Sequence, residues 1–473
     1  MKLKVMLARF LIPICVFGLV STAMATNEFL NIGSMNPVLN SNAEDFLLLY
    51  ARTTGANANM LTLYTRDSTG KFLYRIVIPD YTNNFLDFPL SPYKVEADGQ
   101  SHDGGIHFRA SVSADGSTIV QCHNEGNSSG ARDVTYQVGA YNNDVDNPRY
   151  IWANYDVAQI NVRTTFVPLL TEFDDSGTTR RRLTLIHHPT HGGDVRLWSY
   201  YGKIMDGTVL DPDIDTIDID ISYDRKDLIS GGADFFAAAS DGGRRYVVYY
   251  HCNGKNSIVA GSDNDAISTK WFNDGNWDNG QKVLIGTTLK QDNKLTKMFL
   301  GPEDPSTHKS HFLLFCRDAD SYDIFCLPGI ITWQYGDGDE TTVTGVSYEL
   351  GTKTTVLGGG SYDVTPNIVV PNDPNASSKA LTKFVILGKD VNTSLHTYYY
   401  SIFDVNFANI GVPNSTILTR KTSARANVLE ATGYKKLLLV PANDGIHFTL
   451  VGLDADSGAL QWTICEIQAG DPS

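Results

Sequence analysis

Histidine is the residue type whose distribution in this chain most strongly suggests chemistry. Six of the eleven histidines fall between residues 102 and 191. His102 stands at the polar entry to one hydrophobic segment, and His123 ends the next one (STIVQCH, 117–123). A hairpin would bring both positions toward the same rim of a sheet. Because imidazole titrates near neutral pH, such a pair could remove a proton or position a substrate. Two structural histidines are the competing interpretation.

The segment that carries these histidines, residues 101–124, resembles the opening motif of a BNR-repeat-like propeller family that includes the propeller-type ulvan lyases. The matching elements are the two histidines, the turn at 115–116 and an aromatic strand at 134–137. The next unit matches through 165–168, 174–177, 185–188 and 192–198. The resemblance therefore runs in order from residue 101 to residue 198, and the rest of the chain matches only in general pattern.

What the resemblance implies is β-elimination at a uronic acid. That reaction needs a group that neutralises the carboxylate, a base that removes the C5 proton and an acid that protonates the leaving oxygen. By position, His102 and His123 would be the base and the carboxylate partner, in either order. His188 stands where the family has a cationic arginine, and it could neutralise the carboxylate if protonated.

The family's catalytic tyrosine falls on Phe166, which cannot transfer a proton. Tyr200 or Tyr201, on the following strand, would then have to take that role, unless this branch does something else. Tyr200 is the candidate for catalysis here. The candidates for substrate binding are Asn124, Arg132, Arg163, Arg196 and Tyr201.

Metal sites are a weaker hypothesis. His187 and His191 are four residues apart, and His251 and Cys252 are adjacent, so a structural zinc is conceivable. Pro189 disfavours a helix for the first pair, and adjacent residues of a strand point to opposite faces. The acidic runs at 211–220 and 336–340 could bind calcium, although solvated turns explain them equally well.

The first 25 residues have the three parts of a secretory signal peptide. A basic start is followed by the short apolar run 10–20 and by small residues at 23–25. We therefore expect a mature chain of residues 26–473, forming one domain and located outside the cell or in the periplasm. A membrane anchor is the alternative, but the apolar run is short for a bilayer span.

The net charge of -15 disfavours nucleic acid and anionic membranes as partners. An anionic polysaccharide would need a local basic patch on this acidic chain. Five cysteines would remain after cleavage, so at least one is unpaired; Cys316 and Cys326 could link neighbouring strands.

Short hydrophobic runs bounded by Gly, Asp or Asn turns recur along the whole chain, and long helical periodicity is absent. They predict an all-β fold built from four-stranded antiparallel units, with unit starts near residues 42, 101, 158, 230, 295, 365 and 425. Seven such units predict a seven-bladed β-propeller, with six or eight blades as the nearest alternatives.

These observations lead to one principal functional hypothesis and two others. The first is a secreted lyase that cleaves a uronate-containing, ulvan-like polysaccharide. The main alternative is a non-catalytic, lectin-like propeller that binds carbohydrate. A sialidase-type hydrolase ranks third, because the chain lacks the repeated S-x-D-x-G-x-T-W boxes.

Overall fold

The computed structural model shows an antiparallel all-β protein, with one short 3-10 helix (η2, Phe407–Asn409) in the part of the chain it describes. The all-β class and antiparallel pairing expected from the sequence are confirmed. The predicted signal peptide lies outside the described residues. The structure describes residues 27–50, 60–89, 92–94, 108–113, 116–124, 132–142, 149–152, 156–175, 178–189, 198–204, 223–227, 235–252, 255–263, 269–272, 297–317, 323–358, 367–369, 381–390, 397–422, 427–429, 433–442 and 444–470.

The described strands form six sheets, and the first two lie in the N-terminal half. The first sheet has the order β3 (Asp45–Tyr50), β4 (Leu61–Arg66), β5 (Phe72–Val77), β6 (Tyr93–Lys94). The second has eight strands: β7 (Phe108–Val112), β8 (Thr118–Asn124), β9 (Arg132–Asn142), β10 (Arg149–Trp152), β11 (Asp156–Asp175), β12 (Thr178–Pro189), β13 (Trp198–Ile204) and β14 (Tyr223–Asp227). Within it, β9 pairs with both β10 and β11, so one sheet joins two sets of four strands.

Three further sheets follow in chain order. The third sheet contains β15 (Phe235–Ser240), β16 (Arg245–Cys252), β17 (Lys255–Asp263) and β18 (Thr269–Phe272). The fourth contains β19 (Lys297–Leu300), β20 (Lys309–Arg317), β21 (Ile324–Gly336), β22 (Asp339–Leu350) and β23 (Thr354–Leu357). The fifth contains β24 (Asn367–Val369), β25 (Lys383–Lys389), β26 (Tyr398–Val405), β27 (Leu418–Arg420) and β28 (Asn427–Leu429).

The last sheet joins the two ends of the described chain. It contains β29 (Tyr434–Pro441), β30 (His447–Asp454) and β31 (Leu460–Ala469), together with β1 (Glu28–Ile32) and β2 (Asn36–Pro37). Strand β1 pairs along its whole length with β31, from Glu28 opposite Ala469 to Ile32 opposite Cys465. An N-terminal strand thus completes a C-terminal sheet, which ties the chain ends together.

Strand and turn chemistry explain these elements locally. The central strands are runs of Val, Ile, Leu, Phe and Tyr, which suit a pleated and buried surface. Turns are fixed by aspartates: Asp454 Oδ1 accepts hydrogen bonds from the backbone N–H groups of Asp456 and Ser457. Gly458 closes that turn with a φ of 68°, a value that favours glycine.

The hydrophobic core lies between neighbouring sheets. One buried cluster joins the third and fourth sheets through residues such as Tyr249, Phe312 and Trp333. Another joins the first sheet to the last through Phe46 and Val451. Burial of both faces of each sheet accounts for the continuous apolar runs in the sequence.

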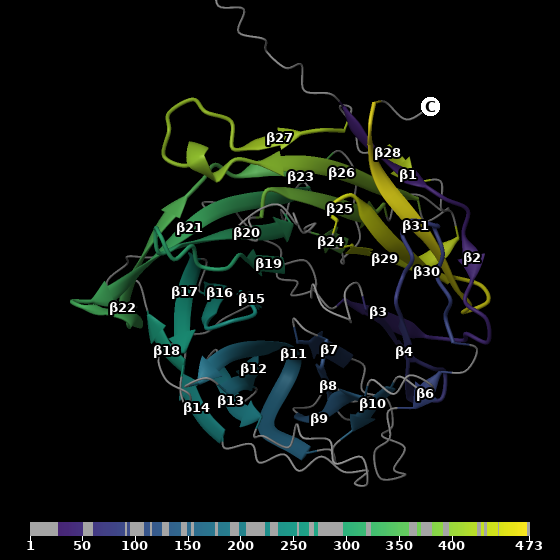
Figure 1. Cartoon of the computed structure of the whole chain (residues 1–473), viewed down its shortest axis with the longest axis horizontal. Helices are drawn as coiled ribbons and strands as arrows, with labels where there is room; N and C mark the ends of the chain where they lie inside the picture. Colours follow the sequence, from purple (N-terminus) through teal and green to yellow (C-terminus); the bar gives the residue numbers. More distant parts are fainter. Residues whose placement is uncertain are drawn as a thin grey trace, which may run out of the picture.

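Strands β3, β7, β11, β15, β19, β24 and β29 lie toward the middle of the molecule (Figure 1). Strand β3 contacts β29 on one side and β7 on the other, and contacts continue from β7 to β11, to β15 and to β19. Strand β24 contacts β29. We refer to these seven strands (β3, β7, β11, β15, β19, β24 and β29) as the inner strands.

Four cysteines are buried and form no disulfide: Cys122, Cys316, Cys326 and Cys465. The link between Cys316 and Cys326 that their spacing allows is therefore not formed, although their strands β20 and β21 are paired. No helix within the described ranges is long and apolar enough to cross a membrane.

Candidate functional site

A cavity of about 500 Å³ lies among the inner strands. Its wall combines apolar side chains with hydroxyl groups, the acid Asp241 and two aromatic rings, those of Tyr50 and Phe299. Each inner strand contributes, represented by Tyr50, Ser111, Leu170, Ser240, Phe299, Ile368 and Val440. Residues that are far apart in sequence are thus assembled into one concave site, which is the usual form of a ligand pocket.

Four charged residues precede the cavity-lining residues on four of these strands. Asp45 begins β3, Arg109 follows the first residue of β7, Lys297 begins β19 and Lys436 lies near the start of β29. The cavity is lined further along the same strands, by Leu48, Ala110, Phe299 and Leu439. We call Asp45, Arg109, Lys297 and Lys436 the channel cluster.

Electrostatic interactions show that the members of the channel cluster lie close together. The pKa of Lys297 is lowered to about 8, first by burial and then by the positive charges of Lys436 and Arg109. Burial also lowers the pKa of Arg109, and the charge of Asp45 partly offsets that effect. These interactions join strands β3, β7, β19 and β29, so the cations converge across the centre of the fold.

One cation of the cluster is held by an acid. Lys436 Nζ donates to Asp45 Oδ1 at 2.7 Å and to the carbonyl oxygen of Phe46 at 2.7 Å. Burial nevertheless lowers the pKa of Lys436, and the contact with Asp45 opposes this shift. Arg109 Nη1 donates to the carbonyl oxygen of Phe108 at 2.9 Å.

The channel cluster therefore has three cations and one acid. Each of the three cations is only partly exposed to solvent. None of the four residues lines the cavity itself. A surplus of positive charge on the strands that form it favours the binding of an anion, because partial burial strengthens the attraction. Nothing in the sequence pattern pointed to these residues, since Arg109 and Lys297 are single cations near the start of a strand and Lys436 follows only Lys435.

His123 is the predicted catalytic residue whose side chain the structure describes, and it lies in the protein core. Its side chain is 1% exposed and its ring lies 5.1 Å from that of Phe72. Its Nδ1 lies 2.7 Å from Gln121 Nε2, close enough for a hydrogen bond. A polymer could reach this imidazole only if the surrounding side chains moved apart, and its catalytic role stays a prediction.

The other predicted catalytic residues are only partly covered by the structure. His188 lies on β12, Tyr200 lies on β13, and His102 is outside the described residues. The backbone of Tyr200 pairs with that of Leu185, which places it on the strand next to β12. Phe166, at the family's tyrosine position, is 1% exposed and its backbone pairs with that of His187.

The predicted substrate-binding residues fall on the same large sheet. Asn124 is on β8, Arg132 on β9, Arg163 on β11 and Tyr201 on β13. Arg196 lies outside the described residues. The structure describes these positions by their backbone alone, so the basic patch that they were expected to form stays a prediction.

The metal hypotheses also stay open. Within the described ranges, no three His, Cys, Asp or Glu side chains are grouped so as to hold a metal ion. The acidic segment 336–340 forms the turn between β21 and β22, with Gly336 opposite Asp339. The run 211–220 and His191 lie outside the described residues, and His187, His251 and Cys252 are placed by their backbone alone.

A second charged group connects the third and fourth sheets. Arg245 on β16 donates through Nε to Glu303 Oε2 at 2.8 Å and through Nη2 to the Tyr335 hydroxyl at 2.6 Å. Tyr335 also donates to Glu303, and His308 Nδ1 lies 3.1 Å from Glu303 Oε1. Burial and the hydrogen bond to Glu303 raise the pKa of Tyr335 to about 12.

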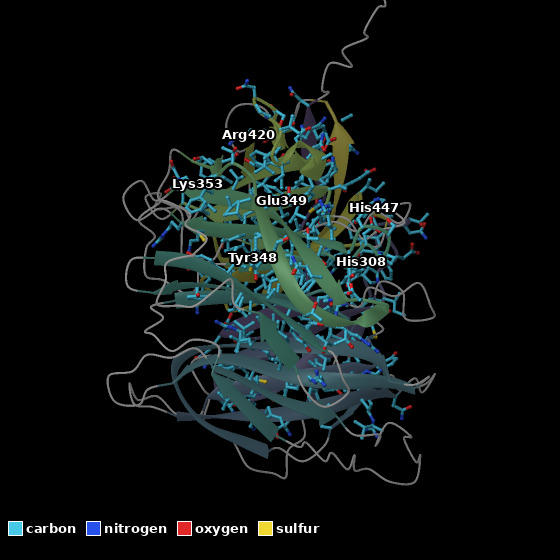
Figure 2. All side chains as sticks on the ribbon, turned by 90° about the vertical axis from the view of Figure 1, so that its left-hand side faces the viewer. His308, Tyr348, Glu349, Lys353, Arg420 and His447 are labelled. Atoms are coloured by element: carbon cyan, nitrogen blue, oxygen red, sulfur yellow. The ribbon has the colours of Figure 1, made fainter. Side chains whose placement is uncertain are left out.

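We call Arg245, Glu303 and Tyr335 the sheet clamp. Its groups satisfy one another, which is the pattern of a structural ion pair. His308 lies beside the sheet clamp on the side of the molecule shown in Figure 2, where β22 carries Tyr348 and Glu349.

Comparisons with known proteins give weak similarities only. No family model and no curated protein matches the chain. Among solved structures, one similar chain is in a complex of the fission yeast SREBP-SCAP binding domains, with 10% identity, a TM-score of 0.40, and coverage of 90% of this chain and 94% of that one. Another is the fucose-specific lectin from Aleuria aurantia, with 8% identity, a TM-score of 0.36, and coverage of 81% and 99%.

Proposed function

We propose that this protein is a seven-bladed β-propeller that binds an acidic carbohydrate at its central channel. Support for the seven blades comes from the strand order. Strands β3, β7, β11 and β15 each open a set of four consecutive strands, and β19 and β24 each open a set of five. The last set, which β29 opens, is completed by β1 and β2. The first residues of the inner strands also lie near the unit starts expected from the sequence; the largest offset is nine residues, from 425 to Tyr434.

The observation that carries the binding proposal is the convergence of Arg109, Lys297 and Lys436 from three inner strands onto one centre. An acidic protein repels anions at long range, so an anionic ligand needs a local excess of positive charge. The channel cluster supplies that excess. A uronate carboxylate or a sulfate group carries the complementary charge.

The cavity wall next to the channel cluster suits a sugar. Ser111 and Ser240 can exchange hydrogen bonds with hydroxyl groups. Tyr50 and Phe299 provide apolar surface for the C–H faces of a pyranose ring. The sequence resemblance to a polysaccharide-cleaving family and the predicted export agree with a polymeric ligand outside the cell.

Lyase activity on a uronate polymer is the second candidate, and the lowered pKa of Lys297 favours it. A lysine whose pKa is about 8 is partly neutral at physiological pH and can act as a base. Its amine would take the C5 proton, the C5 electron pair would form the C4=C5 double bond, and the C4–O4 bond would break. The departing oxygen would take a proton from water, while Arg109 and Lys436 neutralise the carboxylate.

Two experiments separate these candidates. Binding of polygalacturonate and of uncharged dextran is measured by calorimetry with the protein starting at residue 26. Formation of the unsaturated product is followed by its ultraviolet absorbance. Binding without absorbance growth supports the carbohydrate-binding protein, and growth that the Lys297→Arg variant loses supports the lyase. Equal binding of both polymers would refute the anion preference.

A further inference from the structure

Arg75 is a buried cation without a charged partner among the described side chains. It lies on β5 and is 2% exposed. Its Nε donates to the Pro89 carbonyl at 3.1 Å, and its Nη2 donates to the carbonyls of Leu39 at 3.3 Å and Asn40 at 3.0 Å. Carbonyl groups satisfy hydrogen bonds but leave the net charge in place.

The remaining nitrogen of this guanidinium, Nη1, makes no hydrogen bond within the described part of the chain. Arg75 lines a cavity of about 210 Å³ between the loop at residues 40–43 and the turn that begins at Asp67. Burial lowers the pKa of Arg75, yet an arginine stays protonated at neutral pH. The cavity therefore has in its wall a positive charge that no described side chain contacts directly.

Asp67 lines the same cavity and gives it a second polar group. Its Oδ1 accepts hydrogen bonds from Thr69 N at 2.8 Å, Thr69 Oγ1 at 2.7 Å and Lys71 N at 3.0 Å. Burial raises the pKa of Asp67, but the hydrogen bonds from Thr69 and Lys71 outweigh burial and lower it. Asp67 Oδ2 accepts none of these bonds, so it can accept a hydrogen bond from a hydroxyl group of a ligand.

We infer that this cavity is a second binding site, which takes a small hydroxy acid such as a single sugar acid. The ligand carboxylate pairs with Arg75 Nη1, and a ligand hydroxyl donates to Asp67. A guanidinium nitrogen that makes no other hydrogen bond, such as Arg75 Nη1, can pair with a carboxylate. A simple inorganic anion fits less well, because Asp67 would repel it. Such an anion also has no hydroxyl group that could donate a hydrogen bond to the Asp67 carboxylate.

Ser68 offers a test that leaves Arg75 and its carbonyl contacts unchanged. Ser68 is exposed and lines the cavity. In Ser68→Glu the new negative charge should weaken the binding of sodium galacturonate roughly tenfold, while Ser68→Lys should not weaken it. Both variants alter one exposed turn residue, so each controls for the folding of the other.

The experiment measures galacturonate and uncharged galactose binding by calorimetry in the full mature chain. A double variant, Lys297→Met with Arg109→Met, removes the two channel cations that Asp45 does not contact, and one galacturonate site should remain. Arg75→Met should abolish that remaining site, with circular dichroism as the folding control. Loss of all binding in the channel double variant would overturn the Arg75 site alone and leave the channel proposal standing.

Equal affinities of Ser68→Glu and Ser68→Lys would also overturn the Arg75 site, even if Arg75→Met fails to fold. Galactose binding as tight as galacturonate binding would contradict the carboxylate pairing. Sulfate binding as tight as galacturonate binding would identify an inorganic anion site and contradict the role of Asp67.

Discussion

Lys436 Nζ lies 2.7 Å from Asp45 Oδ1, and this pair connects the inner strand β29 to the inner strand β3. It leaves Arg109 and Lys297 as the cations of the channel cluster that no acid of the cluster holds in direct contact. The pair therefore links the first sheet to the last sheet. The negative charge of Asp45 also lowers the net positive charge of the channel cluster.

Removing the acid of this pair should strengthen anion binding. Asp45→Asn keeps the size of the side chain but raises the net charge of the channel cluster by one. We expect tighter binding of polygalacturonate and a loss of about 1 kcal/mol in the free energy of unfolding, because the pair is partly exposed. Calorimetry and urea denaturation measure the two effects. Weaker binding in Asp45→Asn would show that Asp45 contacts the ligand.

Anion binding at the channel should depend on the protonation of Lys297. Because the pKa of Lys297 is about 8, its positive charge is lost as the pH rises through that value. Polygalacturonate affinity should therefore fall between pH 7 and pH 9 in the native protein. Lys297→Arg stays charged over this range and should show a flat profile. An equal decline of polygalacturonate affinity in both proteins would show that a group other than Lys297 causes it.

The same pKa makes a prediction about stability. In the unfolded chain Lys297 keeps its proton until about pH 10.4. Between about pH 8 and that value the unfolded state binds more protons than the folded state, so this group makes stability rise with pH. Urea denaturation at several pH values measures the free energy of unfolding. The difference in this free energy between the native protein and Lys297→Met should rise with pH. A constant difference would contradict the lowered pKa.

The sheet clamp should contribute strongly to folding stability. Arg245→Met leaves the carboxylate of Glu303 without its guanidinium in a site where the two side chains are 7% and 14% exposed. We expect a loss of about 3 kcal/mol in the free energy of unfolding. Lys71→Met, which removes an exposed cation elsewhere, should change stability by less than about 0.5 kcal/mol. Similar losses in both variants would contradict the role of the sheet clamp.

The buried thiols should be unreactive in the folded protein. Cys122, Cys316, Cys326 and Cys465 are each no more than 1% exposed, and burial raises the pKa of Cys122, Cys326 and Cys465. A thiol reagent should label these four only after unfolding in guanidinium. Mass spectrometry of labelled peptides identifies the sites. Rapid labelling of Cys465 in the native state would indicate that the pairing of β1 with β31 opens.

The sequence predicted strands better than it predicted the site. Runs such as 46–52, 311–316 and 436–442 are apolar enough to specify buried strands, and they correspond to β3, β20 and β29. The channel cluster depends instead on which strands meet at the centre. Arg109, Lys297 and Lys436 are far apart in the chain and share no motif, so only the three-dimensional arrangement brings their charges together.

The burial of His123 could not be predicted from the sequence. Its position at the end of a strand suggested an accessible rim, whereas its side chain packs against Phe72 in the core. A strand end and a buried position look alike in sequence, because burial depends on the neighbouring sheet. Arg75 was overlooked for the same reason: an arginine inside the hydrophobic run 72–78 gives no sign of the cavity beside it.

The most direct test of the proposed function is calorimetric titration of polygalacturonate into the channel double variant, Lys297→Met with Arg109→Met. Matched controls are the native protein and a double variant of exposed lysines, Lys353→Met with Lys71→Met, which has the same net charge. We predict affinity at least tenfold weaker in the channel variant and nearly unchanged affinity in the control. Equal weakening in the two variants, or none in either, would contradict anion binding at the channel.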